Sequence, residues 1–223
     1  MISRRKKEYP DYWNEYEASF YNGLSKNVGN VNFVVLDTET TGFDVKRDRI
    51  LSIGALRIKN GTINVRESFE VFIEQKHFDE KTVAIHGILK KGKVKQVSEL
   101  EGLKRLLCLL KNAVLIAHHV GFDVGMLNQA LKRNGLPKLK NRTLDTAVLY
   151  NRSLPQREQK INGHFTLDEL AAKFDISTTD RHTALGDAYI TGIAFLHILS
   201  KLKPASTQNL LKRDRFSGFW RPF

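Results

Sequence analysis

The 223-residue chain is poor in cysteine and has no long apolar run, and each shortage excludes a class of protein. A single cysteine, Cys108, can form neither an intramolecular disulfide nor a zinc site with several thiolates. It lies in the apolar run 106–110, which predicts a buried core thiol in a reducing compartment. No stretch approaches the roughly 18 apolar residues of a membrane-spanning helix, and the N-terminal segment lacks the apolar region of a secretory signal. We therefore expect a cytoplasmic protein that does not enter a membrane.

Acidic residues are also scarce: 24 aspartates and glutamates stand against 36 lysines and arginines, which leaves a net charge of +12. Such an excess attracts polyanions and makes association salt-dependent, so nucleic acid is the leading class of partner. Disorder of the whole chain is excluded, because 41% of the residues are hydrophobic. A chain of this length can bury roughly 70% of its unfolded surface, so no disulfide or structural metal is needed for stability.

Three strands are expected early in the chain. Residues 33–36 and 50–58 are rich in β-branched and apolar side chains, and residues 63–73 alternate between apolar and polar near their end. Asn60 and Gly61 both tolerate positive φ, so this pair predicts a tight hairpin between the second and third strands. The first part of the sheet should therefore be antiparallel.

From about residue 80 the apolar spacing becomes that of helices alternating with short strands. The predicted elements are a helix at 100–110, a buried strand at 113–117, a helix at 124–131, a short strand at 143–146, and helices at 167–173 and 184–202. Thr183 is a suitable N-cap for the last of these helices. The pattern indicates one α/β domain with an extension at each end.

Two carboxylates occur at the end of the first predicted strand, in the segment DTETTG that begins at Asp37. Side chains alternate between the faces of a strand, so Asp37 and Glu39 point the same way. Like charges this close are costly unless neutralised, and a hard divalent cation with oxygen ligands is the simplest neutraliser. Two solvated acids at a strand end would give the same pattern, so this pair alone is weak evidence.

Further acids follow in two later segments. Asp123 comes after the strand at 113–117 and near the start of a helix, where a carboxylate is also an ordinary capping residue. His182 and Asp187 flank the start of the long helix. The carboxyl ends of neighbouring strands and the adjacent helix starts face one crevice in an α/β fold, so all these acids could converge there. Four acids and one histidine would make a two-metal site with a general base.

The segments that carry these residues resemble the motifs of a known family. LDTETTGFD, AHHVGFDVGML and RHTALGDA are similar, in order and separation, to the three motifs of DnaQ-like, DEDDh-type 3'-to-5' exonucleases. The resemblance covers about residues 32–200 and implies an RNase H-like α/β fold. Its mixed five-stranded sheet would have three antiparallel strands, then parallel strands, flanked by helices. The implied division is an N-terminal aromatic and basic extension (1–30), the exonuclease domain (31–203) and a basic aromatic C-terminal tail (204–223).

The resemblance also implies a role for each motif residue. Asp37 would bridge two Mg²⁺ or Mn²⁺ ions, and Glu39 and Asp187 would complete the site of one of them. Asp123 would hold the other ion, partly through water. His182 would be the general base, and a histidine that titrates near neutrality is suited to take a proton from an attacking water.

The same resemblance assigns the terminal nucleotide to a pocket around Thr40, Gly42 and Phe43, with His86 and Phe122 lining it. A glycine lets the chain turn near the sugar, and an aromatic ring offers a flat face to a base. Core packing is the alternative for both phenylalanines, and helix capping is the alternative for His86.

One position departs from the family pattern. His119 stands where the family usually has asparagine, and we expect metal binding to survive while substrate contact or pH dependence changes. Asp145, at a probable strand end, corresponds to an acid often found in the family, and we expect a structural or supporting role for it.

The two ends of the chain are rich in aromatic residues. Trp13, Tyr16 and Phe20 are spaced as a helical stripe, which we expect to pack on the protein's own core rather than on a partner. The segment 211–223 mixes cations with aromatics, a composition that suits binding of single strands and equally suits packing on the protein itself. Replicative proofreading subunits of the family hold a polymerase through a C-terminal extension, but nothing in this segment identifies that partner.

The sequence therefore predicts a metal-dependent exonuclease that removes nucleoside 5'-monophosphates from 3' ends of single-stranded or frayed DNA, in proofreading or repair. RNA 3'-trimming, of the oligoribonuclease or RNase T type, is the nearest alternative, because no feature reports on the 2'-hydroxyl. A catalytically weak nucleic-acid-binding module or polymerase partner is a second alternative. A metal-independent glycosidase using two carboxylates is a third, but it leaves the other acids and the positive charge without a role. No feature indicates an oligomeric state.

Overall fold

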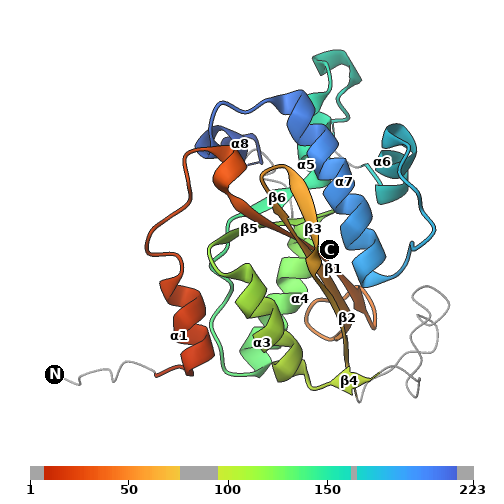
Figure 1. Cartoon of the computed structure of the whole chain (residues 1–223). Coiled ribbons are helices and arrows are strands. Elements are labelled where there is room, and N and C mark those ends of the chain that lie inside the picture. The colour runs from red at the N-terminus through yellow and green to blue at the C-terminus, as the bar shows by residue number, and fades with distance from the viewer. Residues whose placement is uncertain (1–7, 76–94, 162–164, 215–223) are drawn as a thin grey trace.

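The computed structural model describes residues 8–75, 95–161 and 165–214 of the chain (Figure 1). In this part of the chain six strands form one mixed sheet in the order β4-β3-β2-β1-β5-β6. The strands are β1 Asn32–Thr40, β2 Ile50–Lys59, β3 Thr62–Ile73, β4 Gln96–Val97, β5 Ala113–Ala117 and β6 Thr143–Asp145. The five expected strands are all present, and the two-residue β4 extends the sheet by a sixth.

The pairing of the strands follows the predicted order. Strand β2 runs antiparallel to both β1 and β3, whereas β5 and β6 lie parallel to β1. Asn60 and Gly61 close the β2–β3 hairpin with φ angles of 52° and 71°. Positive φ at both central residues is the geometry whose twist matches that of the flanking strands. Strand β4 pairs with the end of β3 and is parallel to it.

Helices cover both faces of the sheet. The helices are α1 Asp11–Ala18, α3 Glu99–Leu110, α4 Val120–Arg133, α5 Thr146–Ser153, α6 Leu167–Phe174, α7 Ala184–Leu202 and α8 Thr207–Asp214. Alternate residues of β1 separate the two layers: Val34 and Leu36 pack in one core cluster with α1, α3 and α4. Phe33 and Val35 pack in the other cluster, with α5, α6, α7 and α8. The sheet is thus the middle layer of a sandwich (Figure 1).

The aromatic stripe of α1 packs on the core, as expected. Trp13 and Tyr16 are both 0% exposed and lie in the cluster beneath α3 and α4. The Tyr16 hydroxyl donates to Asn141 Oδ1 at 2.6 Å and accepts from the Lys140 backbone N–H at 2.8 Å. This helix is therefore fixed to the chain that leads into β6.

One expectation about the helices needs correction, and one further helix was not expected. Cys108 is exposed, not buried, because only the helical stripe of Leu103, Leu106, Leu107 and Leu110 faces the core and residue 108 falls outside it. Part of the predicted C-terminal tail is the helix α8, which the sequence analysis did not anticipate and whose Leu210 is fully buried. In the described part of the chain, no helix has the length and hydropathy needed to cross a bilayer.

Candidate active site

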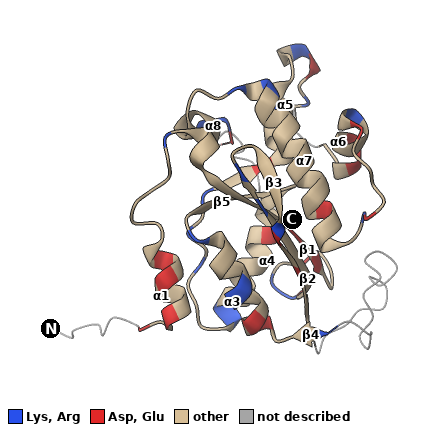
Figure 2. Cartoon of the chain, in the orientation of Figure 1, with Lys and Arg blue, Asp and Glu red and all other residues tan. Residues whose placement is uncertain are grey.

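Three carboxylates meet where β1 approaches the start of α7. Asp37 and Glu39 project from the same face of β1, and Asp187 lies on the first turn of α7. One carboxylate oxygen from each residue lies within 4.8 Å of the other two. Figure 2 shows acidic segments of β1, α4 and α7 gathered near the middle of the molecule. The structure thus brings together three of the four predicted acids in one cluster.

A glycine lets α7 approach β1 so closely. Gly54 of β2 is the register partner of Asp37, and a Cβ atom placed on it would lie 2.1 Å from backbone atoms of Ala184 and Leu185. No side chain fits there, so the first turn of α7 rests directly on the sheet. Glu70 of β3 is the next residue across this row and accepts the Leu185 N–H at 3.2 Å. Thr183 caps the helix, as predicted, by accepting the Gly186 N–H at 3.1 Å.

Arg181 neutralises part of the acid cluster. Its guanidinium binds both carboxylate oxygens of Asp168 on α6, at 2.6 and 3.0 Å, and donates from Nη1 to Asp187 Oδ2 at 2.5 Å. The backbone N–H of His182 donates to the other oxygen of Asp187 at 3.3 Å. The sequence analysis missed Arg181 and Asp168; the only signal was a cation directly before His182 in the third motif.

Asp123 reaches the site from the opposite face of β1. It is 3% exposed, and its Oδ1 accepts the hydroxyl proton of Thr38, the residue between Asp37 and Glu39, at 2.7 Å. Asp145, at the end of β6, accepts the backbone N–H groups of His119 and Val120 at 3.3 and 3.0 Å. Asp145 thus supports the start of α4, which agrees with the structural role expected for it.

Burial and mutual repulsion raise the pKa values of these acids. Burial is the largest cause for Asp37, whose pKa rises well above the usual range, and the charges of Asp123, Asp187 and Glu39 raise it further. Burial, then Asp187 and Asp123, raises the pKa of Glu39 to about 7. Burial also raises the pKa of Asp187, although Arg181 opposes this shift. Anions held together at such cost, with only oxygen donors, fit a hard divalent cation.

His182 is exposed at the mouth of this cluster. It lies in the loop before α7 with a left-handed backbone, at φ 65°, and its neighbour Thr183 forms the helix cap. The structure therefore places the backbone of this histidine in hydrogen-bond contact with Asp187, with its side chain open to solvent. Its predicted role as a base remains a prediction.

The residues predicted to hold a nucleotide lie around the end of β1. Phe43 is 84% exposed, and its ring centroid lies 6.0 Å from that of Phe122, which is half-buried against the core. Phe122 therefore packs against the core, whereas Phe43 does not. The Thr40 hydroxyl donates to the carbonyl of Gly42 at 2.8 Å. His86 lies outside the described residues.

Glycine is needed at position 42 for a different reason from the expected one. Its φ is outside the left-handed region, so the turn does not require glycine. A Cβ atom on it would lie 2.6 Å from the carboxylate of Asp48. Asp48 closes the loop after β1 by accepting the Thr41 hydroxyl and the Asp44 backbone N–H, each at 2.8 Å. Gly42 therefore leaves room for this loop closure.

His119 occupies a backbone conformation that explains the residue types found there. Its φ and ψ are 60° and 49°, a left-handed conformation in which asparagine and histidine are both enriched. The substitution for asparagine is thus accommodated by the backbone. His118, beside it, is bound through Nε2 to the Phe165 carbonyl at 2.8 Å and through Nδ1 to the Thr146 hydroxyl at 2.9 Å. Burial lowers the pKa of His118 to about 4, so this ring is a neutral structural group.

Comparison with known proteins identifies the family. A family model described as exonuclease (RNase_T) matches residues 34–195. The chain belongs to this exonuclease family. The DnaQ-like, DEDD-type resemblance is therefore confirmed, and the match includes all three acids of the cluster.

Two relatives of this exonuclease are bacterial polymerases. The chain is 32% identical over 200 residues to the PolC-type DNA polymerase III of Oceanobacillus iheyensis, covering 89% of this chain and 13% of that protein. It is also 32% identical over 187 residues to the PolC-type enzyme of Halalkalibacterium halodurans, covering 83% and 12%. The chain thus spans only about an eighth of the length of these relatives.

A solved structure shares the fold. Exonuclease I of E. coli, in complex with a dT13 oligonucleotide, has a TM-score of 0.67 at 18% identity, covering 78% of this chain and 42% of that chain. This similarity supports the RNase H-like α/β fold expected from the sequence.

Proposed function

We propose that this exonuclease is a metal-dependent 3'-to-5' exonuclease that hydrolyses the 3'-terminal phosphodiester of single-stranded or frayed DNA and releases nucleoside 5'-monophosphates. The observation that carries the proposal is the convergence of Asp37, Glu39 and Asp187 within 4.8 Å in the fold of an exonuclease family. Carboxylates with raised pKa values at one point are poor candidates for a purely structural cluster.

The cluster suits divalent cations. Asp37, Glu39 and Asp187 would hold one ion, and Asp37 together with Asp123 would hold a second. When bound, two such cations supply charge for the attacking water and for the leaving 3'-oxygen of an in-line displacement. Arg181 already neutralises part of Asp187, so its guanidinium must share that carboxylate with an ion.

The remaining residues have roles that do not involve the ions. His182 is proposed to take the proton of the attacking water, because its side chain is exposed beside Asp187 and free to turn toward the scissile phosphate. Phe43 is proposed to stack on the terminal base, since most of its ring faces solvent. Thr40, Gly42, His86, His119 and Phe122 remain proposed contacts of the terminal nucleotide.

DNA is the proposed substrate because the relatives are DNA polymerases and the neighbouring structure holds a DNA oligonucleotide. The same similarity supports a polymerase partner, as a proposal. Cytoplasmic localisation, the division into extensions and domain, and the identity of the ions stay predictions.

The deciding experiment follows 5'-labelled single-stranded DNA and its RNA counterpart on a gel, each with Mg²⁺, Mn²⁺ or EDTA. We expect a ladder that shortens from the 3' end, requires metal and favours DNA. Faster shortening of RNA would transfer the proposal to RNA trimming. No cleavage of either strand with any metal would overturn it.

A variant of His182 tests its proposed role as the general base. His182→Ala should lower turnover roughly a hundredfold, as for the loss of a positioned base, and calorimetric Mn²⁺ binding should be unchanged. Unaltered turnover would remove His182 from the proposed chemistry.

A further inference from the structure

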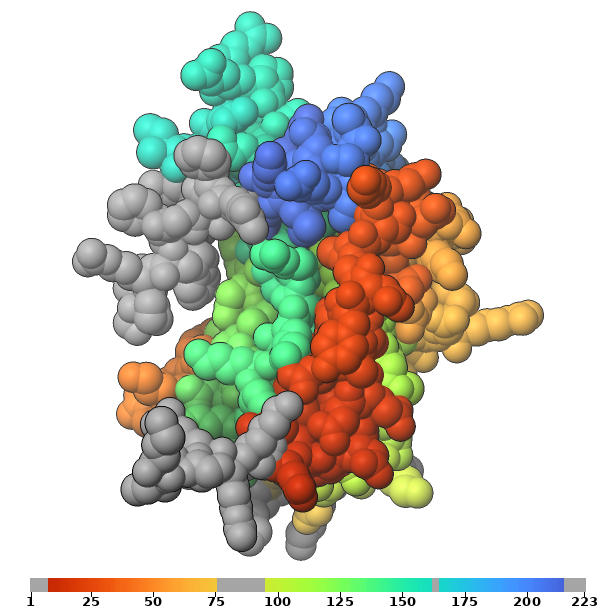
Figure 3. All heavy atoms as spheres, turned by 90° about the vertical axis from the view of Figure 1, so that its left-hand side faces the viewer, coloured from red at the N-terminus to blue at the C-terminus, as the bar shows by residue number. Residues whose placement is uncertain are grey.

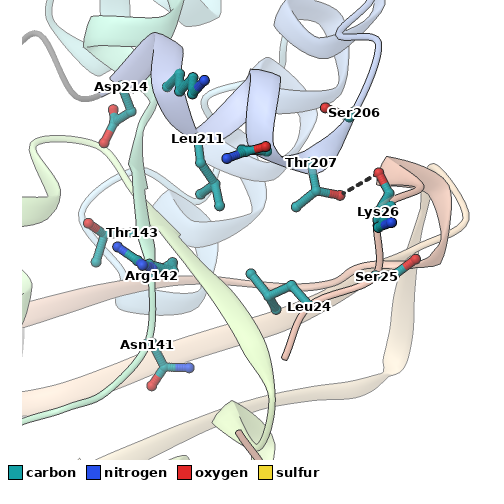
Figure 4. Close-up of a pocket in the computed structure, with 12 residues that line it drawn as sticks. Leu24, Ser25, Lys26, Asn141, Arg142, Thr143, Ser206, Thr207, Leu211 and Asp214 are labelled. Carbon is teal, nitrogen blue, oxygen red and sulfur yellow. Dashed lines mark hydrogen bonds between the residues drawn. The ribbon is translucent and has the colours of Figure 1, made fainter. Parts of the chain in front are cut away.

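A groove of about 560 Å³ lies beside the edge of the sheet, outside the candidate active site (Figure 4). We call it the edge groove; it is formed by residues 24–26, residues 141–143 at the start of β6, and one side of α8. Figure 3 shows the face where these segments, far apart in the sequence, come together: red-orange for the segment after α1, green for the chain entering β6, and blue for α8.

Contacts between these segments fix the shape of the edge groove. Thr207 donates to the Lys26 carbonyl from its backbone N–H at 3.0 Å and from its hydroxyl at 3.3 Å. At the other end, the backbone N–H of Asp145 donates to Asp214 Oδ1 at 3.0 Å. Leu210 is fully buried, which fixes α8 against the core. The groove is therefore a built feature of the fold.

Positive charge dominates the lining of the edge groove. Lys26, Arg142 and Lys212 line it from three separate segments, and all three are exposed. None of them forms an ion pair with a carboxylate in the described part of the chain. Among the lining residues the one acid is Asp214, whose carboxylate is engaged with the Asp145 N–H. Ser25 and Thr143 add hydroxyl groups.

A second cavity, of about 590 Å³, provides a contrast. It lies between β3 and the start of α7, and its charged lining residues are the acids Glu70 and Asp180, with no lysine or arginine. Two cavities of similar size therefore differ in the sign of their charge. Of these two cavities in the described part of the chain, the edge groove is the one whose charge suits an anion.

We propose that the edge groove binds backbone phosphates of a single-stranded nucleic acid whose 3' end occupies the candidate active site. This inference rests on the proposed function for the position of the 3' end. The groove ends at Asp214, which contacts Asp145, and Asp145 in turn holds the start of the helix that carries Asp123. The proposed path of the strand therefore runs from the active site, past the start of α4, to the groove.

A strand explains the arrangement better than a small anion does. The cations are spread over three segments around an open groove, so they match successive phosphates rather than one.

The test compares two triple variants of the full chain with the same charge. The groove variant is Lys26→Gln, Arg142→Gln and Lys212→Gln. The control variant is Lys59→Gln, Arg66→Gln and Lys132→Gln, which removes three exposed cations that line neither the groove nor the candidate site. Binding of a fluorescent 20-nucleotide oligo-dT is followed by anisotropy in EDTA, over a range of salt concentrations.

We expect the groove variant to bind roughly 10 to 100 times more weakly than the control variant at 0.1 M salt. The slope of log K against log salt concentration should be smaller by about 2, since each phosphate contact on a single strand contributes about 0.7. Equal affinities and slopes for the two variants would overturn the proposal. So would competition by dTMP or inorganic phosphate that is as effective, per phosphate, as competition by unlabelled oligo-dT.

Turnover separates this proposal from the proposed function. Hydrolysis of a trinucleotide, which we expect the active site alone to hold, should be unchanged in the groove variant, whereas KM for the 20-nucleotide strand should rise. If wild-type protein hydrolyses nothing but the two variants still differ in binding, the proposed function fails and the groove is retained as a binding site. If trinucleotide hydrolysis falls as much as binding of the long strand does, the groove is not a separate site.

Discussion

Helices α4 and α7 each bring one acid to β1, from opposite faces of the sheet, and they are fixed by different forces. The start of α7 touches the backbone of β2 at Gly54, where no side chain fits. The start of α4 is held by hydrogen bonds to Asp145 and, through Asp123, to Thr38. The start of α7 is thus positioned by a close backbone contact in addition to polar ones, whereas the start of α4 is positioned by polar contacts.

This difference predicts how each half of the site fails. A Cβ atom added at Gly54 would lie 2.1 Å from the backbone of α7, so it must move α7 as a body. A helix held by a cap loses stability when the cap is removed, but other groups and water can partly satisfy its N–H groups. The charges differ in the same way: Asp187 is paired with Arg181, while Asp123 accepts the Thr38 hydroxyl and forms none of the ion pairs found among the described residues.

The largest effect is expected at Asp37, whose pKa is raised by the charges of both Asp123 on α4 and Asp187 on α7. Asp37→Asn should lower hydrolysis at least about 1000-fold, because the ions would lose a shared ligand. The unfolding temperature in EDTA should not fall, since the variant removes a buried charge that repels its neighbours. Asp11→Asn on α1 is the control and should leave both quantities unchanged. Activity of Asp37→Asn close to wild type would remove this residue from the site.

Gly54→Ala should have the next largest effect. The added methyl group would overlap Ala184 and Leu185, so α7 and Asp187 must shift, and a displacement of about 1 Å can cost about 100-fold in rate. Overpacking should also lower the free energy of unfolding by about 1–3 kcal/mol.

Gly192→Ala is a matched control on the same helix. A Cβ atom there would lie 3.3 Å from the Leu56 side chain, which can adjust, and alanine is the better helix former. Near wild-type kcat/KM for Gly192→Ala, beside a large loss for Gly54→Ala, is the expected pair of results. Equal kcat/KM for the two variants would show that the contact at Gly54 does not position Asp187.

Asp145→Ala tests the polar contacts that hold the start of α4. It removes acceptors for the N–H groups of His119, Val120 and Ala147, so urea unfolding should show a loss of about 2 kcal/mol. We expect kcat/KM to fall only about tenfold, because α4 is loosened rather than displaced. Ser98→Ala removes a cap of α3, distant from the acids, and should cost about 1 kcal/mol with unchanged kcat/KM. Equal kcat/KM for the two cap variants would mean that Asp145 acts on stability alone.

The parts of this comparison that the sequence predicted are local ones. The hairpin at Asn60 and Gly61 and the cap at Thr183 depend on neighbouring residues, and both were confirmed. The order of the motifs also predicted that Asp37, Glu39 and Asp187 would meet, since strand ends and helix starts share one edge of the sheet.

The parts that escaped prediction depend on contacts distant along the chain. Gly54 had no visible role because Ala184, which it touches, is far away in sequence. The pairing of Arg181 with Asp168 joins the loop before α7 to α6 and follows no periodic spacing. Cys108 was misassigned for a local reason: an unbroken apolar run was taken as wholly buried, although a surface helix buries only one stripe.

The smallest expected effect is on the pH dependence of stability. It compares the acids near α7 with Glu39 protonated and with Glu39 ionised. In the folded, metal-free protein the pKa of Glu39 is raised to about 7 by burial and then by Asp187 and Asp123. The folded state then binds more protons than the unfolded state between about pH 4.5 and 7, so this group's contribution to stability is lost as the pH rises through that range. Glu39→Gln cannot ionise and should gain stability over wild type by up to about 2 kcal/mol at pH 8 in EDTA, with little difference at pH 4. Urea unfolding at the two pH values measures this gain.

Saturating Mg²⁺ should reverse the order of stability of wild type and Glu39→Gln at pH 8, because a cation favours the ionised carboxylate that the variant lacks. A gain that is equal at both pH values, or that persists unchanged in Mg²⁺, would show that the charge of Glu39 is not what strains the site.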